Sequence, residues 1–101
     1  MAHKWRVAAV QMDCVLDDKE ANQTHAAEMI AAAASGRARL VVLPELFSTG
    51  YRVETRDMEL AETLSDATVR WMQVMAQRYD VYVTGAILER GADGLVYDTA
   101  V

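Results

Sequence analysis

The chain has 101 residues, which is enough for one small domain or for part of a larger one. Hydrophobic residues make up 52% and charged residues 25%, a composition typical of globular proteins that argues against intrinsic disorder. Fifteen acidic and ten basic residues give a formal net charge of −5, without long runs of one sign. The sequence therefore lacks the basic patch of a nucleic-acid-binding protein and the polybasic segment of a membrane-surface protein.

The single cysteine, Cys14, has no partner for a disulfide within the chain, which fits a reducing compartment. The apolar run near the N-terminus is too short for the core of a signal peptide, and no stretch approaches the length of a transmembrane helix. We therefore expect a cytoplasmic protein.

The first half of the chain predicts a strand, a helix and a second strand. Residues 5–12 form a short apolar run with little alternation, as in a strand covered on both faces. Residues 19–35 are helical in pattern and end at Gly36. Their apolar side contains Gln23, Ala26, Ala27, Ile30, Ala33 and Ala34. Residues 38–45 contain a second continuous apolar run, so we expect a parallel strand–helix–strand unit.

The second half predicts a helix and then a hairpin. Residues 46–57 read as irregular, with a bend at Gly50, and residues 58–64 as a short helical turn. Ser65 is a candidate N-cap for a helix over residues 66–79, whose apolar residues recur at helical spacing (Val69, Met72, Ala76 and Tyr79). Residues 80–90 and 95–101 flank the Gly-containing turn 91–94, which predicts an antiparallel hairpin.

Together these elements predict an α/β fold with a mixed sheet, parallel at first and antiparallel at its end. A sheet of about four strands with two helices leaves an edge and a face uncovered. We therefore expect residues 1–101 to be the N-terminal portion of a larger single domain.

Glu45 is the strongest candidate for a functional residue. Pro44 fixes its own φ and favours an extended residue before it, so the strand continues to the proline and delivers Glu45 at its carboxyl end. Ligands of α/β proteins bind at that edge of the sheet. Four apolar or aromatic residues flank the carboxylate, and partial desolvation by them would raise its pKa towards that of a general base (Leu43, Leu46, Phe47 and Tyr51). The alternative is an exposed glutamate or a salt-bridge partner.

The sequence gives weaker support for a functional role of the cysteine and the histidines. Cys14 follows the first strand, but no histidine lies near it in the sequence, which favours a core thiol over a nucleophile. Two histidines and one cysteine do not have the spacing of metal ligands, so we expect no metal. His25 falls opposite Ile30 on the helix and is expected to face solvent.

Several segments resemble the nitrilase superfamily of carbon–nitrogen hydrolases. They are "VAAVQMD", Asn22 at the start of an alanine-rich helix, and above all "RLVVLPELFSTGY". "VYVTGAILER" and "LVYDTAV" resemble the next two strands of that family, with Asp98 where asparagine is usual. The resemblance covers nearly the whole chain.

This resemblance implies a four-layer α-β-β-α sandwich, homo-oligomeric assembly, and a catalytic set of glutamate, lysine and cysteine without a cofactor. By motif matching the glutamate is Glu45, the general base. Phe47 and Tyr51 are candidates for shaping the substrate pocket or bracing Glu45, although for Phe47 we favour a role in core packing. The chain's lysines and Cys14 do not match the family's lysine and cysteine motifs, so we expect this chain alone to be inactive.

The sequence thus predicts a hydrolase of small amides, carbamoyl amines or nitriles that works through a thioester, with only the glutamate in this chain. The alternative is a non-catalytic α/β module that uses Glu45 to contact a ligand or partner, or an inactive truncated product.

Overall fold

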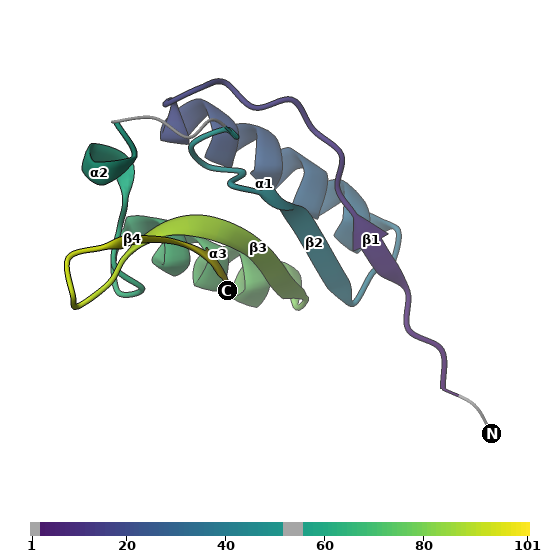
Figure 1. Cartoon of the computed structure of the whole chain (residues 1–101). Helices are drawn as coiled ribbons and strands as arrows, with labels where there is room; N and C mark the ends of the chain where they lie inside the picture. The colour runs from purple at the N-terminus through teal and green to yellow at the C-terminus, as the bar shows by residue number, and fades with distance from the viewer. Residues whose placement is uncertain (1–2, 52–55) are drawn as a thin grey trace.

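The computed structural model describes residues 3–51 and 56–101, which form a four-stranded sheet with two long helices packed on one of its faces (Figure 1). The elements follow one another as β1 (Val7–Ala9), α1 (Lys19–Ser35), β2 (Leu40–Glu45), α2 (Asp57–Leu60), α3 (Ala67–Tyr79), β3 (Tyr82–Arg90) and β4 (Val96–Ala100). The predicted order of strand, helix, strand, helix and hairpin is confirmed. Residues 52–55 of the predicted irregular segment lie outside the described residues.

The sheet is mixed, as predicted, and its strands lie in the order β1-β2-β3-β4. The first three strands are parallel, and β3 and β4 form the antiparallel hairpin. Two backbone hydrogen bonds close the turn of that hairpin, Gly91 N–H to the Leu95 carbonyl at 2.9 Å and Gly94 N–H to the Gly91 carbonyl at 2.9 Å.

The first strand is shorter than predicted, three residues instead of eight. Its last backbone bond to β2 runs from the Val10 N–H to the Val42 carbonyl at 2.8 Å. Pro44, two residues further along β2, has no N–H to continue the ladder. The chain therefore leaves the sheet after Val10, although Val10 and Met12 still pack against the core.

Helix α1 begins where the sequence predicts, because the Asp18 carboxylate accepts a hydrogen bond from the Ala21 N–H at 3.0 Å and caps the first turn. Its fully buried residues are Asn22, Ala26 and Ile30, spaced four apart. The buried stripe is thus shifted from the predicted one, and its first member is a polar residue. His25, predicted to face solvent, is half-buried, and its ring lies 3.3 Å from the Asp13 carbonyl oxygen.

The prediction of Ser65 as the N-cap of α3 is wrong. The cap residue is Asp66, which makes no side-chain bond to the helix, and the carboxylate of Glu62 accepts the Thr68 N–H at 3.0 Å instead. The helical turn predicted for residues 58–64 is confirmed only in its first part. The backbone of Glu62 is already extended, and it pairs with Glu89 of β3 in an isolated parallel β-bridge.

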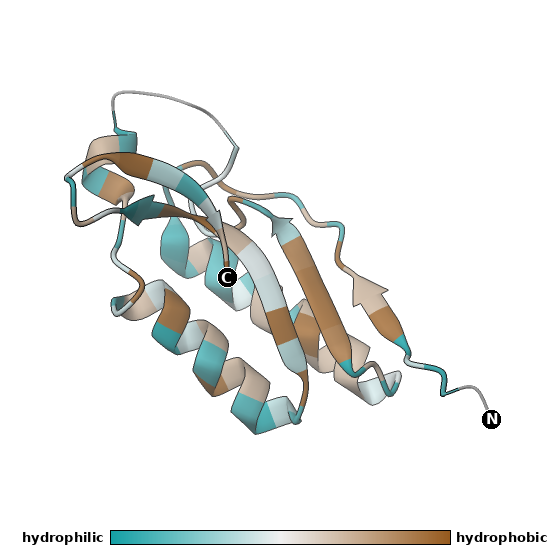
Figure 2. Ribbon diagram, turned by 60° about the horizontal axis from the view of Figure 1, so that its bottom comes forward, coloured by the Kyte–Doolittle hydropathy of each residue, from teal (hydrophilic) through white to brown (hydrophobic). Residues whose placement is uncertain are grey.

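The main core lies between the two long helices and the sheet. It contains Ala26 and Ile30 of α1, Val41 and Leu43 of β2, Val69, Met72 and Met75 of α3, and Phe47, Val81 and Ile87. Figure 2 shows the apolar character of β2, which is brown along most of its length above the helices. Within residues 3–51 and 56–101, no long helix covers the opposite face of the sheet, which we call the helix-free face. None of the described helices is long and apolar enough to cross a membrane.

Candidate active site

Glu45 is the last residue of β2, at the carboxyl end of a parallel strand, as predicted. Val42 pairs with Thr84 of β3 but Glu45 pairs with Ala86, so three steps along β2 oppose two along β3. Side chains alternate between the faces of a strand, and a bulge of one residue reverses that alternation. Glu45 therefore shares the helix-free face with Val42, whereas Leu43 points into the core.

The backbone around Glu45 is rigid on both sides. Pro44 precedes it, and Leu46 follows it with φ of 52°, in the left-handed region that costs a leucine roughly 1–2 kcal/mol. Two contacts hold Leu46 in this conformation. Its N–H donates to the Ala86 carbonyl at 2.9 Å, and its buried side chain packs with Ala61 and Leu88. Strained residues held in this way are found preferentially at functional sites.

The carboxylate lies at a shallow hollow of about 420 Å³ in the helix-free face. The other residues that line this hollow come from β2, β3 and β4 (Val42, Leu43, Thr84, Gly85, Ala86, Asp98 and Ala100). Of the four neighbours expected from the sequence, only Leu43 is among them. The aromatic neighbours expected for Glu45 are therefore absent from the hollow, because the bulge turns the carboxylate away from the core-facing side of the strand, although most of the residues that line the hollow are apolar.

The hydrogen-bonding partner of Glu45 is Asp98 of β4, the residue at the position where the resemblance leads us to expect asparagine. A side-chain hydrogen bond with Asp98 raises the pKa of Glu45, and burial and the negative charge of Asp98 raise it further. The direction is the one expected for a general base, but the first cause is a second carboxyl group rather than desolvation by apolar neighbours.

Phe47 and Tyr51 do not line the hollow. Phe47 is fully buried in the main core, where its ring lies 5.8 Å from that of Trp71 and packs on Gly85. This is the core-packing role favoured above for Phe47. Tyr51 is 70% exposed, and its role in substrate binding stays a prediction.

Asn22 holds the loop that follows Glu45, a role that the sequence analysis missed. Its amide donates to the Ser48 carbonyl and to the Val15 carbonyl, and its oxygen accepts the Val15 N–H, each at 2.7 Å. The side chain is 1% exposed. One residue of α1 thus fixes both the loop after β1 and the loop after β2. Its spacing of four and eight residues from Ala26 and Ile30 is the signal that would have placed it on the buried stripe.

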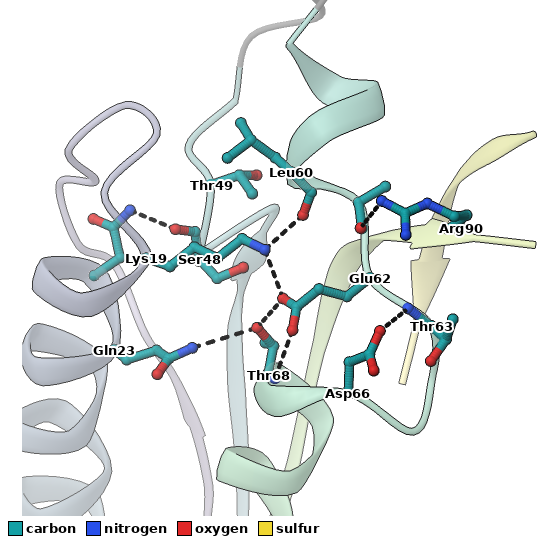
Figure 3. A network of polar contacts seen from close by, with 12 residues as sticks. Lys19, Gln23, Ser48, Thr49, Leu60, Glu62, Thr63, Asp66, Thr68 and Arg90 are labelled. Atoms are coloured by element: carbon teal, nitrogen blue, oxygen red, sulfur yellow. Dashed lines mark hydrogen bonds and ion pairs between the residues drawn. The ribbon is translucent and has the colours of Figure 1, made fainter.

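A second polar network joins α1 to the start of α3 (Figure 3). The Lys19 ammonium bonds the Glu62 carboxylate at 2.8 Å and the Leu60 carbonyl at 2.5 Å. The Thr68 hydroxyl also donates to Glu62 and accepts a bond of 3.3 Å from Gln23. Burial alone would raise the pKa of Glu62, but the bonds from Lys19 and Thr68 outweigh it and hold this pKa below 4.5. The network connects α1 to the start of α3, and the Lys19 ammonium is held by its hydrogen bonds to Glu62 and to Leu60.

Cys14 is half-buried, and burial and the charge of Asp13 raise the pKa of its thiol. Since the thiolate is the reactive form, this environment fits a packed thiol better than a nucleophile. Across residues 3–51 and 56–101, no group of three or more histidine, cysteine, aspartate or glutamate side chains is arranged to hold a metal ion.

Known proteins resemble this chain along almost its whole length. The family model described as carbon-nitrogen hydrolase matches residues 6–101. A nitrilase of Pyrococcus abyssi is 35% identical over 99 residues, and the 2-oxoglutaramate amidase of Bacillus subtilis is 28% identical over 96 residues. The crystal structure of XC1258 from Xanthomonas campestris, a CN-hydrolase superfamily protein with an arsenic adduct in its active site, matches with a TM-score of 0.85 and 27% identity.

These matches cover most of this chain but a minority of each relative. They span 95% of this chain and 37% of the Pyrococcus protein, 95% and 36% for the Bacillus protein, and 98% and 36% for XC1258. The chain thus spans little more than a third of the length of these relatives. One helix layer on one sheet layer is consistent with half of the four-layer α-β-β-α sandwich that the resemblance implies.

Proposed function

The chain belongs to the carbon–nitrogen hydrolase family, and from this premise we propose that it supplies the general base of a hydrolase that cleaves non-peptide carbon–nitrogen bonds. The observation that carries the proposal is the placement of Glu45. It stands at the carboxyl end of a parallel strand, between Pro44 and the left-handed Leu46, at a hollow in the helix-free face. A carboxylate fixed in this way is suited to take a proton from a reacting group.

The proposed reaction on an amide passes through a thioester. Glu45 accepts the proton of a cysteine thiol, and the sulfur forms a bond to the carbonyl carbon. A lysine ammonium stabilises the negative charge that develops on the carbonyl oxygen. The carbon–nitrogen bond then breaks as Glu45 passes the thiol proton to the leaving amine, which leaves a thioester on the cysteine. Glu45, again a carboxylate, then removes a proton from the water that attacks the thioester and releases the acid. A nitrile reaches the same thioester in two steps: the sulfur adds to the nitrile carbon to give a thioimidate, and water then adds and the nitrogen leaves as ammonia.

The cysteine and the lysine of this reaction are proposed to come from polypeptide outside the 101 residues. Lys19 is held by Glu62 and by the Leu60 carbonyl, which leaves its ammonium committed to the junction of α1 and α3. Cys14 has a raised pKa and therefore little thiolate at neutral pH. The coverage of about a third of the relatives supports the same proposal.

The proposed substrates are small linear amides, carbamoyl amines or nitriles, with no cofactor. The names of the two curated relatives support a nitrile or an amide without choosing between them. The chain by itself, with one of the three catalytic groups, is expected to be inactive. Cytoplasmic location and homo-oligomeric assembly stay predictions from the sequence.

The test begins with the coding sequence beyond Val101, where the proposal requires a lysine within a few tens of residues and a cysteine further on. The full-length product is then assayed for ammonia or amine release from a small amide, a carbamoyl amine and a nitrile, with a short peptide as the control substrate. We expect release from at least one of the three and none from the peptide bond. A full-length product that lacks the cysteine, or that hydrolyses none of the three, contradicts the proposal.

A further inference from the structure

Asn22 binds two loops at the carboxyl edge of the sheet, loop 13–18 before α1 and loop 46–50 after β2. Its amide nitrogen donates to the Val15 carbonyl and to the Ser48 carbonyl, and its oxygen accepts the Val15 N–H. One short side chain thus provides two donors and one acceptor, which is the combination that an amide supplies. The side chain is buried, so water does not compete for these bonds.

The two loops also contact each other directly through their backbones. The Asp17 N–H donates to the Thr49 carbonyl at 2.8 Å. Gly50, with φ of 85°, lies so close to Leu16 that a Cβ atom on it would be 2.8 Å from Leu16 Cδ2 and 3.3 Å from Leu16 Cα. Such a close approach of two backbones requires glycine. The loop after β2 is therefore held by the loop before α1 as well as by the Asn22 side chain.

This support reaches Glu45 through Leu46. Leu46 has the left-handed φ of 52°, a conformation that persists only where the surrounding structure holds it. Its N–H donates to the Ala86 carbonyl at 2.9 Å, and its carbonyl accepts the Gly50 N–H at 2.8 Å. Gly50 ends the loop that Asn22 fixes, so loss of the Asn22 bonds weakens the second of these contacts. A Leu46 that relaxed to an ordinary φ would change the direction in which Glu45 leaves β2.

We propose that Asn22 is a positioning residue for the Glu45 carboxylate and that it acts through loop 46–50 and Leu46. This inference rests on the proposed function of Glu45 as the general base. Proton transfer depends on the distance and direction between the base and the thiol, and a misplacement of about 1 Å can cost about 10²-fold in rate. Asn22 does not line the hollow, so its effect on the reaction passes through the loop.

The first test is amide hydrogen exchange of the full-length protein, measured by mass spectrometry relative to the amides of β3. In the unmodified protein we expect the Leu46 and Gly50 amides to exchange as slowly as those of β3, because both are hydrogen-bonded in a supported loop. In Asn22→Ala we expect these two amides to exchange at least about tenfold faster than those of β3. Fast exchange of the two amides in the unmodified protein would overturn the inference, and this result needs no variant to fold.

Ile30→Ala is the matched control, because Ile30 lies about two turns beyond Asn22 on the same helix and is also fully buried. Its truncation destabilises the whole fold through the cavity that it leaves. We expect Ile30→Ala to change the exchange of Leu46 and Gly50 no more than that of β3, and to leave kcat nearly unchanged. An equal effect of the two variants on the loop amides and on kcat would mark Asn22 as merely structural and overturn the positioning role.

The kinetic test is a double-mutant cycle on kcat in the full-length protein. Asn22→Ala should lower kcat by about 10²-fold with KM little changed, because the base is displaced while the substrate still binds. In the Glu45→Gln background the same substitution should have little effect, since no base remains to be positioned. Losses that multiply in the double variant would show that Asn22 acts independently of Glu45 and would overturn the inference.

The two tests also separate this inference from the proposed function. Faster exchange of the Leu46 and Gly50 amides in Asn22→Ala, in a full-length protein that hydrolyses none of the proposed substrates, would support the role of Asn22 in holding the loop and reject the proposed function.

Discussion

Asn22 shows how a single buried amide fixes the loop behind Glu45. Its three hydrogen bonds of 2.7 Å join α1 to Val15 and to Ser48. We expect Asn22→Ala to lower the free energy of unfolding by about 2–4 kcal/mol, because the buried Ser48 carbonyl loses its partner and a void is left. Urea denaturation of the chain measures this. Gln23→Ala, next along the helix, removes only one bond of 3.3 Å and should cost less than about 1 kcal/mol. Equal losses in the two variants would contradict the role given to Asn22.

Glu62 makes stability depend on pH in a defined direction. Its pKa in the folded chain is lower than 4.5, its ordinary value. The unfolded chain therefore binds the proton more readily, so the stabilisation is fully present above about pH 4.5 and is lost as the pH falls through the folded pKa. We expect Glu62→Gln to be less stable than the unmodified chain at pH 7 and to lose less stability on acidification. Urea midpoints measured from pH 7 downwards test this, and parallel pH profiles for the two proteins would contradict it.

At the scale of single residues, the sequence located Glu45 but not its surroundings. The strand that ends in Pro-Glu places the carboxylate at the sheet edge, and that placement is confirmed. The bulge between Val42 and Glu45 depends on pairing with β3, which is a long-range contact that local pattern does not contain. Three of the four neighbours predicted for Glu45 therefore lie away from the hollow, and the local pattern does not indicate Asp98 as a neighbour.

Gly85 is required by the packing between β3 and the residues that follow Glu45. A methyl group added there would lie 3.1 Å from the Phe47 ring and 3.2 Å from Leu43 Cβ, both buried. We expect Gly85→Ala to lower the free energy of unfolding by about 1–3 kcal/mol through this overpacking. Thermal or urea unfolding provides the measurement.

Gly36→Ala is the control for that substitution. Gly36 follows α1 with φ of −78°, and an added methyl group would approach nothing closer than 3.4 Å. Alanine at such a site should be neutral or stabilise by about 0.4–1 kcal/mol, because it restricts the unfolded chain. If both glycine variants lost the same stability, the close contact with Phe47 would not be the cause.

At the scale of elements, patterns of local origin were predicted well and boundaries set by tertiary contacts were not. The 3.6-residue period and Gly36 gave the bounds of α1, and the apolar runs around residues 91–94 gave the hairpin. The early end of β1 follows from its pairing with β2. The N-terminal cap of α3 comes from Glu62, whose extended segment is held by Lys19 of α1 and by β3. Neither contact is visible in the local sequence.

At the scale of the whole molecule, the two faces of the sheet have different roles. One face packs on α1 and α3 and contains the main core, including Phe47. The other presents Glu45 and Asp98 at an open hollow. A thioester reaction requires a site from which most water is excluded. In the four-layer sandwich, a second sheet would cover this face, and we infer that it brings the cysteine and the lysine to Glu45.

The central claim is that Glu45 is the catalytic base, and the most direct measurement is kcat for Glu45→Gln in the full-length protein. Glu28→Gln is the matched control, because Glu28 is exposed on α1, on the other side of the sheet. We expect Glu45→Gln to lower kcat by about 10²–10⁴-fold with its thermal unfolding unchanged, and Glu28→Gln to retain full activity. A Glu45→Gln enzyme that turns over substrate at the unmodified rate would contradict the account.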